Sequence, residues 1–230
     1  MCGRYSLTAK AETLSKRFRI EVGEQYHPRY NAAPTQILPI IISENPQGLS
    51  LFYWGVAPEW SKNKAISSKY FNARAETLLE KTSLQNALKT RRCIIPADGF
   101  YEWKNISKKS KIPYRIMLQN KEVFAFAGLW EEYENEENAM VHTFTIITTA
   151  ATAAMKEISD RMPVILRPEA EKIWLNEASD LENLMHALNP AENIDYHTVS
   201  TLVNSEQNDR PEVIKPAPAI DQFGNYTLFS

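Results

Sequence analysis

Cysteine is scarce in this chain of 230 residues, which contains only Cys2 and Cys93. Two thiols do not build a disulfide framework, and they are too few for a typical structural zinc site. The four histidines are scattered without the spacing of metal ligands. We therefore expect no metal and no cofactor. Cys93, in the run Cys93-Ile94-Ile95, is expected to be a buried core residue.

Long apolar runs are also missing. The longest candidate, residues 37–42, is interrupted by Pro39 and falls far short of the roughly 18 residues that a membrane helix needs. The first residues, Met1 to Tyr5, lack the apolar core of a signal peptide. These absences predict a cytoplasmic protein with no membrane partner. Glycine, with 7 residues, is rare enough that each is expected to meet a backbone requirement.

The composition, with 43% hydrophobic and 23% charged residues, is that of an ordinary globular protein. Short aromatic and β-branched segments in the middle of the chain predict strands, and helical periodicity predicts helices over 9–19, 76–89, 150–157, 168–176 and 180–188. Because these elements do not alternate regularly, we predict an α+β fold. It is a single domain over 1–230 around a curved, barrel-like, mostly antiparallel sheet flanked by helices. A Pro-rich, extended tail is expected from about residue 205, and the default expectation is a monomer.

The net charge of -2 conceals two unlike halves. Residues 1–120 contain 19 basic and 9 acidic side chains, whereas residues 121–230 contain 7 and 19. A basic half suggests a polyanionic partner, most commonly nucleic acid. The alternative, equally compatible with the counts, is that the two halves pack together and neutralise each other.

Cys2 is the sharpest chemical feature of the sequence. Methionine aminopeptidase removes Met1 when the next residue is small, which would leave an α-amine and a thiol on adjacent carbons. Their reference pKa values, about 7.7–8.0 and 8.5, keep both nucleophiles partly available near neutral pH. Such a group condenses with an aldehyde to an imine and then a thiazolidine, or it acts as an N-terminal nucleophile on an amide. The plain alternative is that cysteine occurs here by chance.

Glu102 lies between aromatic residues in Gly99-Phe100-Tyr101-Glu102-Trp103. Partial burial there would raise its pKa into the range useful for acid–base chemistry. Strand alternation would instead place Glu102 at a solvated edge, and this motif alone slightly favours that interpretation.

Other polar residues precede or follow predicted elements. Asn72 both donates and accepts hydrogen bonds, and Arg74 and Arg161 offer planar groups that fit phosphate. Thr148 ends a strand, where its hydroxyl could reach a backbone group or a ligand. The structural alternatives are a turn for Asn72 and ion pairs for the arginines, with Glu76 and Asp160 as their respective partners.

These motifs together resemble one family closely. The chain is similar to the SRAP family (SOS response-associated peptidase) in ordered matches from residue 2 to about residue 200. They are Met1-Cys2-Gly3-Arg4-Tyr5, Tyr30-Asn31-Ala32-Ala33-Pro34-Thr35, Trp54-Gly55, Asn72-Ala73-Arg74-Ala75-Glu76-Thr77, Arg92 to Trp103, Phe126-Ala127-Gly128-Leu129-Trp130 and Asp160 to Leu166.

The resemblance implies that the protein binds single-stranded DNA and crosslinks covalently to abasic sites, which makes it nucleoid-associated when DNA-bound. Cys2 would form a thiazolidine with the ring-opened sugar aldehyde, Asn72 would hold the sugar, and Glu102 would transfer protons. DNA phosphates would be bound by Arg4, Arg74 and Arg161, with Thr148 a weaker candidate. The family also implies a thiol autopeptidase activity and a curved, barrel-like α+β fold.

Ser159 departs from the family pattern, which usually has histidine immediately before Asp-Arg-Met-Pro. Histidine shuttles protons near neutral pH, and serine cannot carry a charge-bearing proton in this range. In the family this position is tied to sugar opening and crosslink reversal. We therefore expect Cys2 and Glu102 to permit crosslinking, with one of those two steps slowed.

Two further functional hypotheses share part of this residue set. An N-terminal-cysteine peptidase, acting only on its own terminus or more widely, uses Cys2 and Glu102 but leaves the arginines without a role. A non-covalent single-stranded DNA binder would be salt-dependent and indifferent to replacement of Cys2.

Overall fold

The computed structural model describes residues 2–55, 71–134 and 137–226. Five strands close into a barrel, because β10 pairs with both ends of the path β4-β3-β6-β9. All neighbours in this ring are antiparallel except β10 and β4, which are parallel. The barrel strands are β3 (Ile37–Ile42), β4 (Asn45–Trp54), β6 (Arg92–Ala97), β9 (Phe124–Glu134) and β10 (Met140–Ala150).

Three short strands extend the barrel wall. β5 (Asn72–Arg74) pairs in parallel with β10, while β11 (Arg161–Pro163) and β12 (Ile165–Leu166) add antiparallel to β10 and β9. A second, antiparallel sheet has the order β13-β8-β7-β1-β2. Its strands are β1 (Tyr5–Leu7), β2 (Arg29–Ala32), β7 (Gly99–Asn105), β8 (Lys111–Leu118) and β13 (Ile194–Thr198).

The alternation of side chains along the barrel strands creates two apolar layers. Ile95 and Phe126 belong to one buried cluster with Trp54, whereas their neighbours Ile94 and Ala127 belong to a second cluster with Trp174 of α3. Gly128 has to be glycine for packing reasons, because a Cβ there would lie 2.4 Å from Ile95 Cδ1. Strands buried on both faces explain why these segments are almost continuously apolar.

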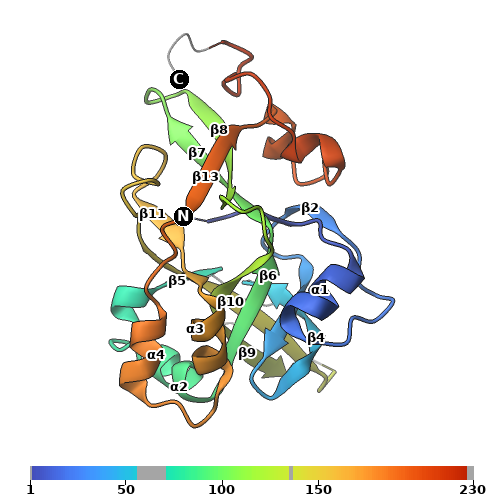
Figure 1. Cartoon of the computed structure of the whole chain (residues 1–230), viewed down its shortest axis with the longest axis vertical. Coiled ribbons are helices and arrows are strands. Elements are labelled where there is room, and N and C mark those ends of the chain that lie inside the picture. Colours follow the sequence, from blue (N-terminus) through green and yellow to red (C-terminus); the bar gives the residue numbers. More distant parts are fainter. Residues whose placement is uncertain (1, 56–70, 135–136, 227–230) are drawn as a thin grey trace.

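Helices cover the barrel wall on different sides (Figure 1). α2, α3 and α4 group together, and α3 packs on α4 and on β6. The helices are α1 (Ala11–Phe18), α2 (Thr82–Thr90), α3 (Pro168–Leu175) and α4 (Leu181–Ala187), with 3-10 turns η1 (Ala75–Thr77), η2 (Thr201–Asn204) and η3 (Pro211–Ile214). The predicted α+β fold with a barrel-like sheet is therefore confirmed.

The helix predicted over residues 150–157 is wrong. β10 continues through Ala150, which pairs with Arg161 of β11, so the intervening residues form only the return turn of a hairpin. A single turn forms where Lys156 N donates to Thr152 O. In the tail, η3 interrupts the expected extended course and buries Val213. Across the described ranges, no helix combines the length and the apolar character needed to cross a membrane.

Candidate functional site

Strand pairing between β1 and β7 brings the start of the chain to Glu102. Tyr5 pairs with Phe100, and Tyr101 N donates a hydrogen bond to Arg4 O at 3.0 Å. Continued by two residues, the same antiparallel register sets Gly3 opposite Glu102. The charge of Glu102 acts on the thiol of Cys2, which indicates that the two side chains lie near each other.

The Cys2 side chain is fully buried, and its Sγ lies 3.8 Å from Arg4 O. Burial raises the pKa of the Cys2 thiol far above its ordinary value, and the nearby charge of Glu102 raises it further. The thiol is therefore neutral at physiological pH. A group that must first lose its proton needs a nearby base, and Glu102 occupies that position.

Glu102 is only 6% exposed, and burial raises its pKa above the usual value for a carboxyl group. The increase keeps a larger share of the side chain in its acid form near neutral pH. The solvated-edge interpretation of the sequence is thus wrong. Of its aromatic neighbours, Phe100 and Tyr101 are completely buried, whereas Trp103 is only partly buried.

Asn72 comes from the opposite side of the site, on β5, where its pairing with Ile146 of β10 fixes its position. Its Nδ2 donates to Cys2 O at 2.7 Å. Its Oδ1 is buried and has no hydrogen-bond partner among the described residues. A buried acceptor without a donor is costly, so this oxygen is suited to receive a hydrogen bond from a ligand hydroxyl.

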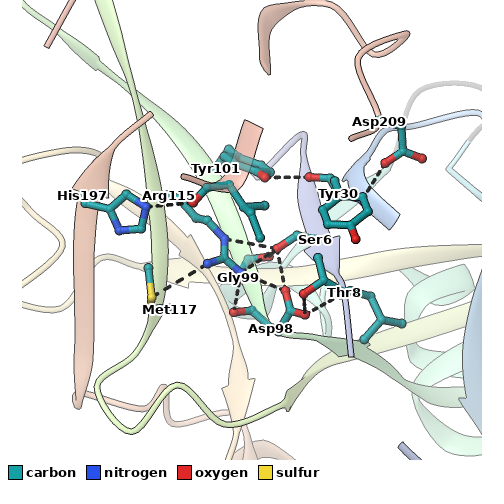
Figure 2. Close-up of polar contacts among 12 residues, drawn as sticks. Ser6, Thr8, Tyr30, Asp98, Gly99, Tyr101, Arg115, Met117, His197 and Asp209 are labelled. Atoms are coloured by element: carbon teal, nitrogen blue, oxygen red, sulfur yellow. Dashed lines mark hydrogen bonds and ion pairs between the residues drawn. The ribbon is translucent and has the colours of Figure 1, made fainter. Parts of the chain in front are cut away.

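A partly buried polar cluster around Asp98 links β1 and the residue after it to β8 (Figure 2). Asp98 accepts hydrogen bonds from Ser6 Oγ at 2.7 Å, from Thr8 Oγ1 at 2.7 Å and from the Thr8 backbone N–H. It also forms an ion pair with Arg115 Nη2 at 2.9 Å. Sequence analysis missed this cluster, although Asp98 lies inside one of the motifs, because nothing local indicates that its partners come from β1 and β8.

Arg161 is engaged within the protein. Its two Nη atoms contact the Glu76 carboxylate at 2.7 and 3.0 Å, and Nη2 also donates to Thr148 O at 2.8 Å. Thr148 is fully buried, and its hydroxyl donates to Ala73 O at 3.2 Å. Thr148 therefore positions Arg161 and β5 from inside the wall. The partner anticipated for Arg161 was Asp160, but the observed carboxylate is Glu76.

Arg4 and Arg74 differ in whether their guanidinium groups are already hydrogen-bonded within the protein. The Arg4 guanidinium donates to Asn31 Oδ1, to Val203 O at 2.7 Å and to Asn204 O, thereby linking the start of the chain to η2. Arg74 is exposed, and Glu76, its anticipated partner, binds Arg161 instead. Arg74 is thus open to a ligand from solvent.

Ser159 and Glu102 line the same cleft, which has a volume of about 590 Å³. One wall is the β7–β8 hairpin, and the other is the turn between β10 and β11 that contains Ser159. Ser159 Oγ accepts a hydrogen bond from Arg161 N at 3.3 Å. Ser159 and the Glu102 carboxyl group thus border the same cleft from opposite walls. Within the described part of the chain, no cluster of His, Cys, Asp and Glu could hold a metal ion.

Comparison with known proteins shows the family to which this chain belongs. The family model for SOS response associated peptidase (SRAP) matches residues 1–206, so the chain belongs to the SRAP family. It is 46% identical over 223 residues to the abasic site processing protein YoqW of Bacillus subtilis, covering 94% of this chain and 99% of that protein. It is 32% identical over 262 residues to the abasic site processing protein HMCES of Gallus gallus, covering 94% and 78%.

Solved structures agree with the fold. A crystal structure of a protein from Bacteroides thetaiotaomicron superimposes with a TM-score of 0.83 at 28% identity, and the match covers 94% of this chain and all of that chain. The family membership indicated by the sequence motifs is therefore confirmed.

Proposed function

We propose that this protein processes abasic sites in DNA by capturing them covalently in single-stranded DNA. After removal of Met1, Cys2 would crosslink to the aldehyde of the ring-opened sugar. The observation that carries the proposal is the meeting of three groups from distant parts of the chain. Asn72 Nδ2 donates to Cys2 O at 2.7 Å, and the pKa of the Cys2 thiol is raised by burial and further by the nearby charge of Glu102. The names of the relatives support the same lesion.

The first step is attack of the Cys2 α-amine on the sugar aldehyde carbon, which gives a carbinolamine. The acid form of Glu102, favoured by its raised pKa, donates a proton to the carbinolamine hydroxyl. Water leaves, and an iminium ion and the Glu102 carboxylate remain. The carboxylate then takes the thiol proton, and sulfur adds to the iminium carbon to close the thiazolidine. Glu102 ends in its acid form, so protons and electrons balance.

This order suits a thiol whose pKa is raised. A peptidase that attacks as a thiolate needs a lowered thiol pKa, commonly supplied by a neighbouring histidine. Burial acts in the opposite direction on Cys2. The residues that line the cleft include no histidine among those described. Amine attack, followed by proton removal from sulfur, therefore fits the site better than amide hydrolysis.

Asn72 would supply the orientation. Its amide nitrogen fixes the Cys2 carbonyl, and its buried Oδ1 would accept a hydrogen bond from a sugar hydroxyl. Exposed Arg74, which follows on the same strand, would contact a neighbouring phosphate. The proposal assigns Ser159 to the wall of the sugar pocket, where it can position water but cannot shuttle a proton as histidine does.

The test uses purified protein whose loss of Met1 is established by intact mass. It is incubated with single-stranded DNA that carries one abasic site, and products are separated on a denaturing gel. We expect a shifted band that requires both Cys2 and the lesion and is absent with Cys2→Ala or undamaged DNA. A fully processed wild-type protein that binds the DNA but gives no band would refute the covalent proposal.

A further inference from the structure

The cleft that contains Glu102 is also lined by three lysines that no motif indicated. Lys104 follows Glu102 on β7, Lys111 lies opposite on β8, and Lys156 is on the facing turn. Among the described residues, none of their ammonium groups takes part in an ion pair or a side-chain hydrogen bond. In contrast, the guanidinium groups of Arg4 and Arg161 already donate hydrogen bonds to acceptors within the protein.

We infer that Lys104, Lys111 and Lys156 form a phosphate-binding subsite for a single-stranded polynucleotide, next to the position of the reacting sugar. The inference rests on the proposed function for its choice of ligand. The Glu102 end of the cleft would hold the lesion sugar, and the lysine end would hold the phosphodiester groups that follow it on one side.

Strand geometry supports this division of the cleft. Glu102 and Lys104 are two residues apart on β7, so their side chains share one face and lie about 6.7 Å apart along the strand. Extended single-stranded DNA that enters with its sugar at Glu102 would bring its next phosphate to Lys104. The cleft volume of about 590 Å³ is within the range of sites that enclose small ligands, roughly 300–1,000 Å³.

Two carboxylates, Glu157 and Asp160, also line the cleft. They stand on the turn beside Lys156, so the charge of that wall is mixed, whereas the β7–β8 wall beyond Glu102 contributes cations. A polynucleotide backbone would therefore follow the hairpin wall, with Lys156 reaching it from across the cleft. This arrangement predicts contact with particular phosphates instead of diffuse attraction to a basic surface.

The same hairpin provides a matched control. Lys108 and Lys109 are exposed near its tip and do not line the cleft. Lys104→Gln with Lys156→Gln, and Lys108→Gln with Lys109→Gln, each remove two positive charges from the full-length protein. Non-covalent affinity for an undamaged single-stranded oligonucleotide is measured by fluorescence anisotropy between 50 and 400 mM salt.

We expect the cleft double variant to lower the slope of log affinity against log salt by about 1.4, since each phosphate contact to a single strand contributes about 0.7. At 0.1 M salt this corresponds to roughly 25-fold weaker binding, when the contacts act through counterion release alone. The tip double variant should change the slope by much less. Equal effects of the two double variants, or no effect of the cleft variant, would overturn the inference.

A second measurement locates the contact along the DNA. Abasic oligonucleotides with one uncharged methylphosphonate linkage, on either side of the lesion, are crosslinked at low protein concentration. In the wild type, an uncharged linkage on one side of the lesion should slow crosslinking. In the cleft double variant, the same uncharged linkage should slow crosslinking little further. Additive effects would refute a direct contact. If wild-type protein never crosslinks while the salt slopes behave as expected, the covalent proposal fails and the subsite stands.

Discussion

Replacement of Asn72 by alanine offers the most direct test of how the site is organised. The change removes the hydrogen bond from Nδ2 to Cys2 O, which measures 2.7 Å in a buried setting. It leaves the Cys2 carbonyl without this donor and also removes the buried acceptor Oδ1. We expect the rate of crosslinking to fall, because the residue that carries both nucleophiles is no longer held against Glu102.

The magnitude follows from the bond that is lost. An unsatisfied buried polar group costs about 1–3 kcal/mol, and each 1.36 kcal/mol in a barrier is a factor of ten in rate. If the whole cost is felt during reaction, crosslinking should slow by about 5- to 150-fold. Asn72→Asp retains an acceptor but loses the donor, so it should be slowed as well.

The assay is single-turnover crosslinking to an abasic oligonucleotide, with protein in saturating excess and quenched samples run on a denaturing gel. Non-covalent affinity for undamaged DNA and the free energy of unfolding are measured in parallel. Asn86→Ala, an exposed site on α2, is the matched control. Crosslinking within twofold of wild type by a stably folded Asn72→Ala protein would refute this account of positioning.

Three further results are expected. Because the acid form of Glu102 is lost as pH rises through its raised pKa, wild-type crosslinking should decline on the alkaline side. Glu102→Gln should abolish that decline and slow the reaction about 100-fold or more, and an unchanged pH profile would contradict the proton-transfer role. Ser159→His should speed sugar opening or crosslink release. Sugar opening is followed with fresh lesions, and release is followed with pre-formed crosslinks. Unaltered rates of both steps would count against the role of this position. Asp98→Ala should lower the free energy of unfolding in urea by about 3–5 kcal/mol by leaving Arg115 buried without its carboxylate, with partial recovery in Asp98→Ala/Arg115→Met.

The sequence predicts the elements of the barrel better than its closure. Segments such as Cys93-Ile94-Ile95 and Phe126-Ala127-Gly128 are apolar on both faces, which is typical of strands covered on both sides. Closure depends on the parallel pairing of Thr143 with Tyr53, two residues 90 positions apart. No local pattern encodes such a pairing. The same limit explains the mistaken helix at 150–157, since an Ala- and Met-containing turn has helical periodicity whether or not a strand precedes it.

Cys2, Asn72 and Glu102 were selected from sequence by their chemistry and by family motifs, and the fold brings them together. The arginines are indicated by the phosphate-binding geometry of the guanidinium group and by the family resemblance, and neither identifies the partners that these side chains have in the fold. Arg161 faces Glu76 across the β10–β11 and β5–η1 connections, and Arg4 reaches carbonyl groups of η2, some 200 residues away. Sequence reasoning could name these side chains as cations, but it could not state which were already engaged.

The three arginines can be ranked as phosphate ligands by the contacts within the protein that each would have to give up. Arg74 is exposed and needs no rearrangement. The Glu76 partner of Arg161 is 47% exposed, and an ion pair this accessible is worth only about 0–1 kcal/mol, so a phosphate can replace the carboxylate at little cost. Arg4 donates to Asn31 Oδ1 and to the carbonyl groups of Val203 and Asn204, so its departure would break three hydrogen bonds that tie the start of the chain to β2 and η2. Arg4 is therefore first an anchor of the N-terminal segment. Under the proposed function, contacts with DNA phosphates would fall chiefly to Arg74, to an Arg161 released from Glu76 and to the lysines of the cleft.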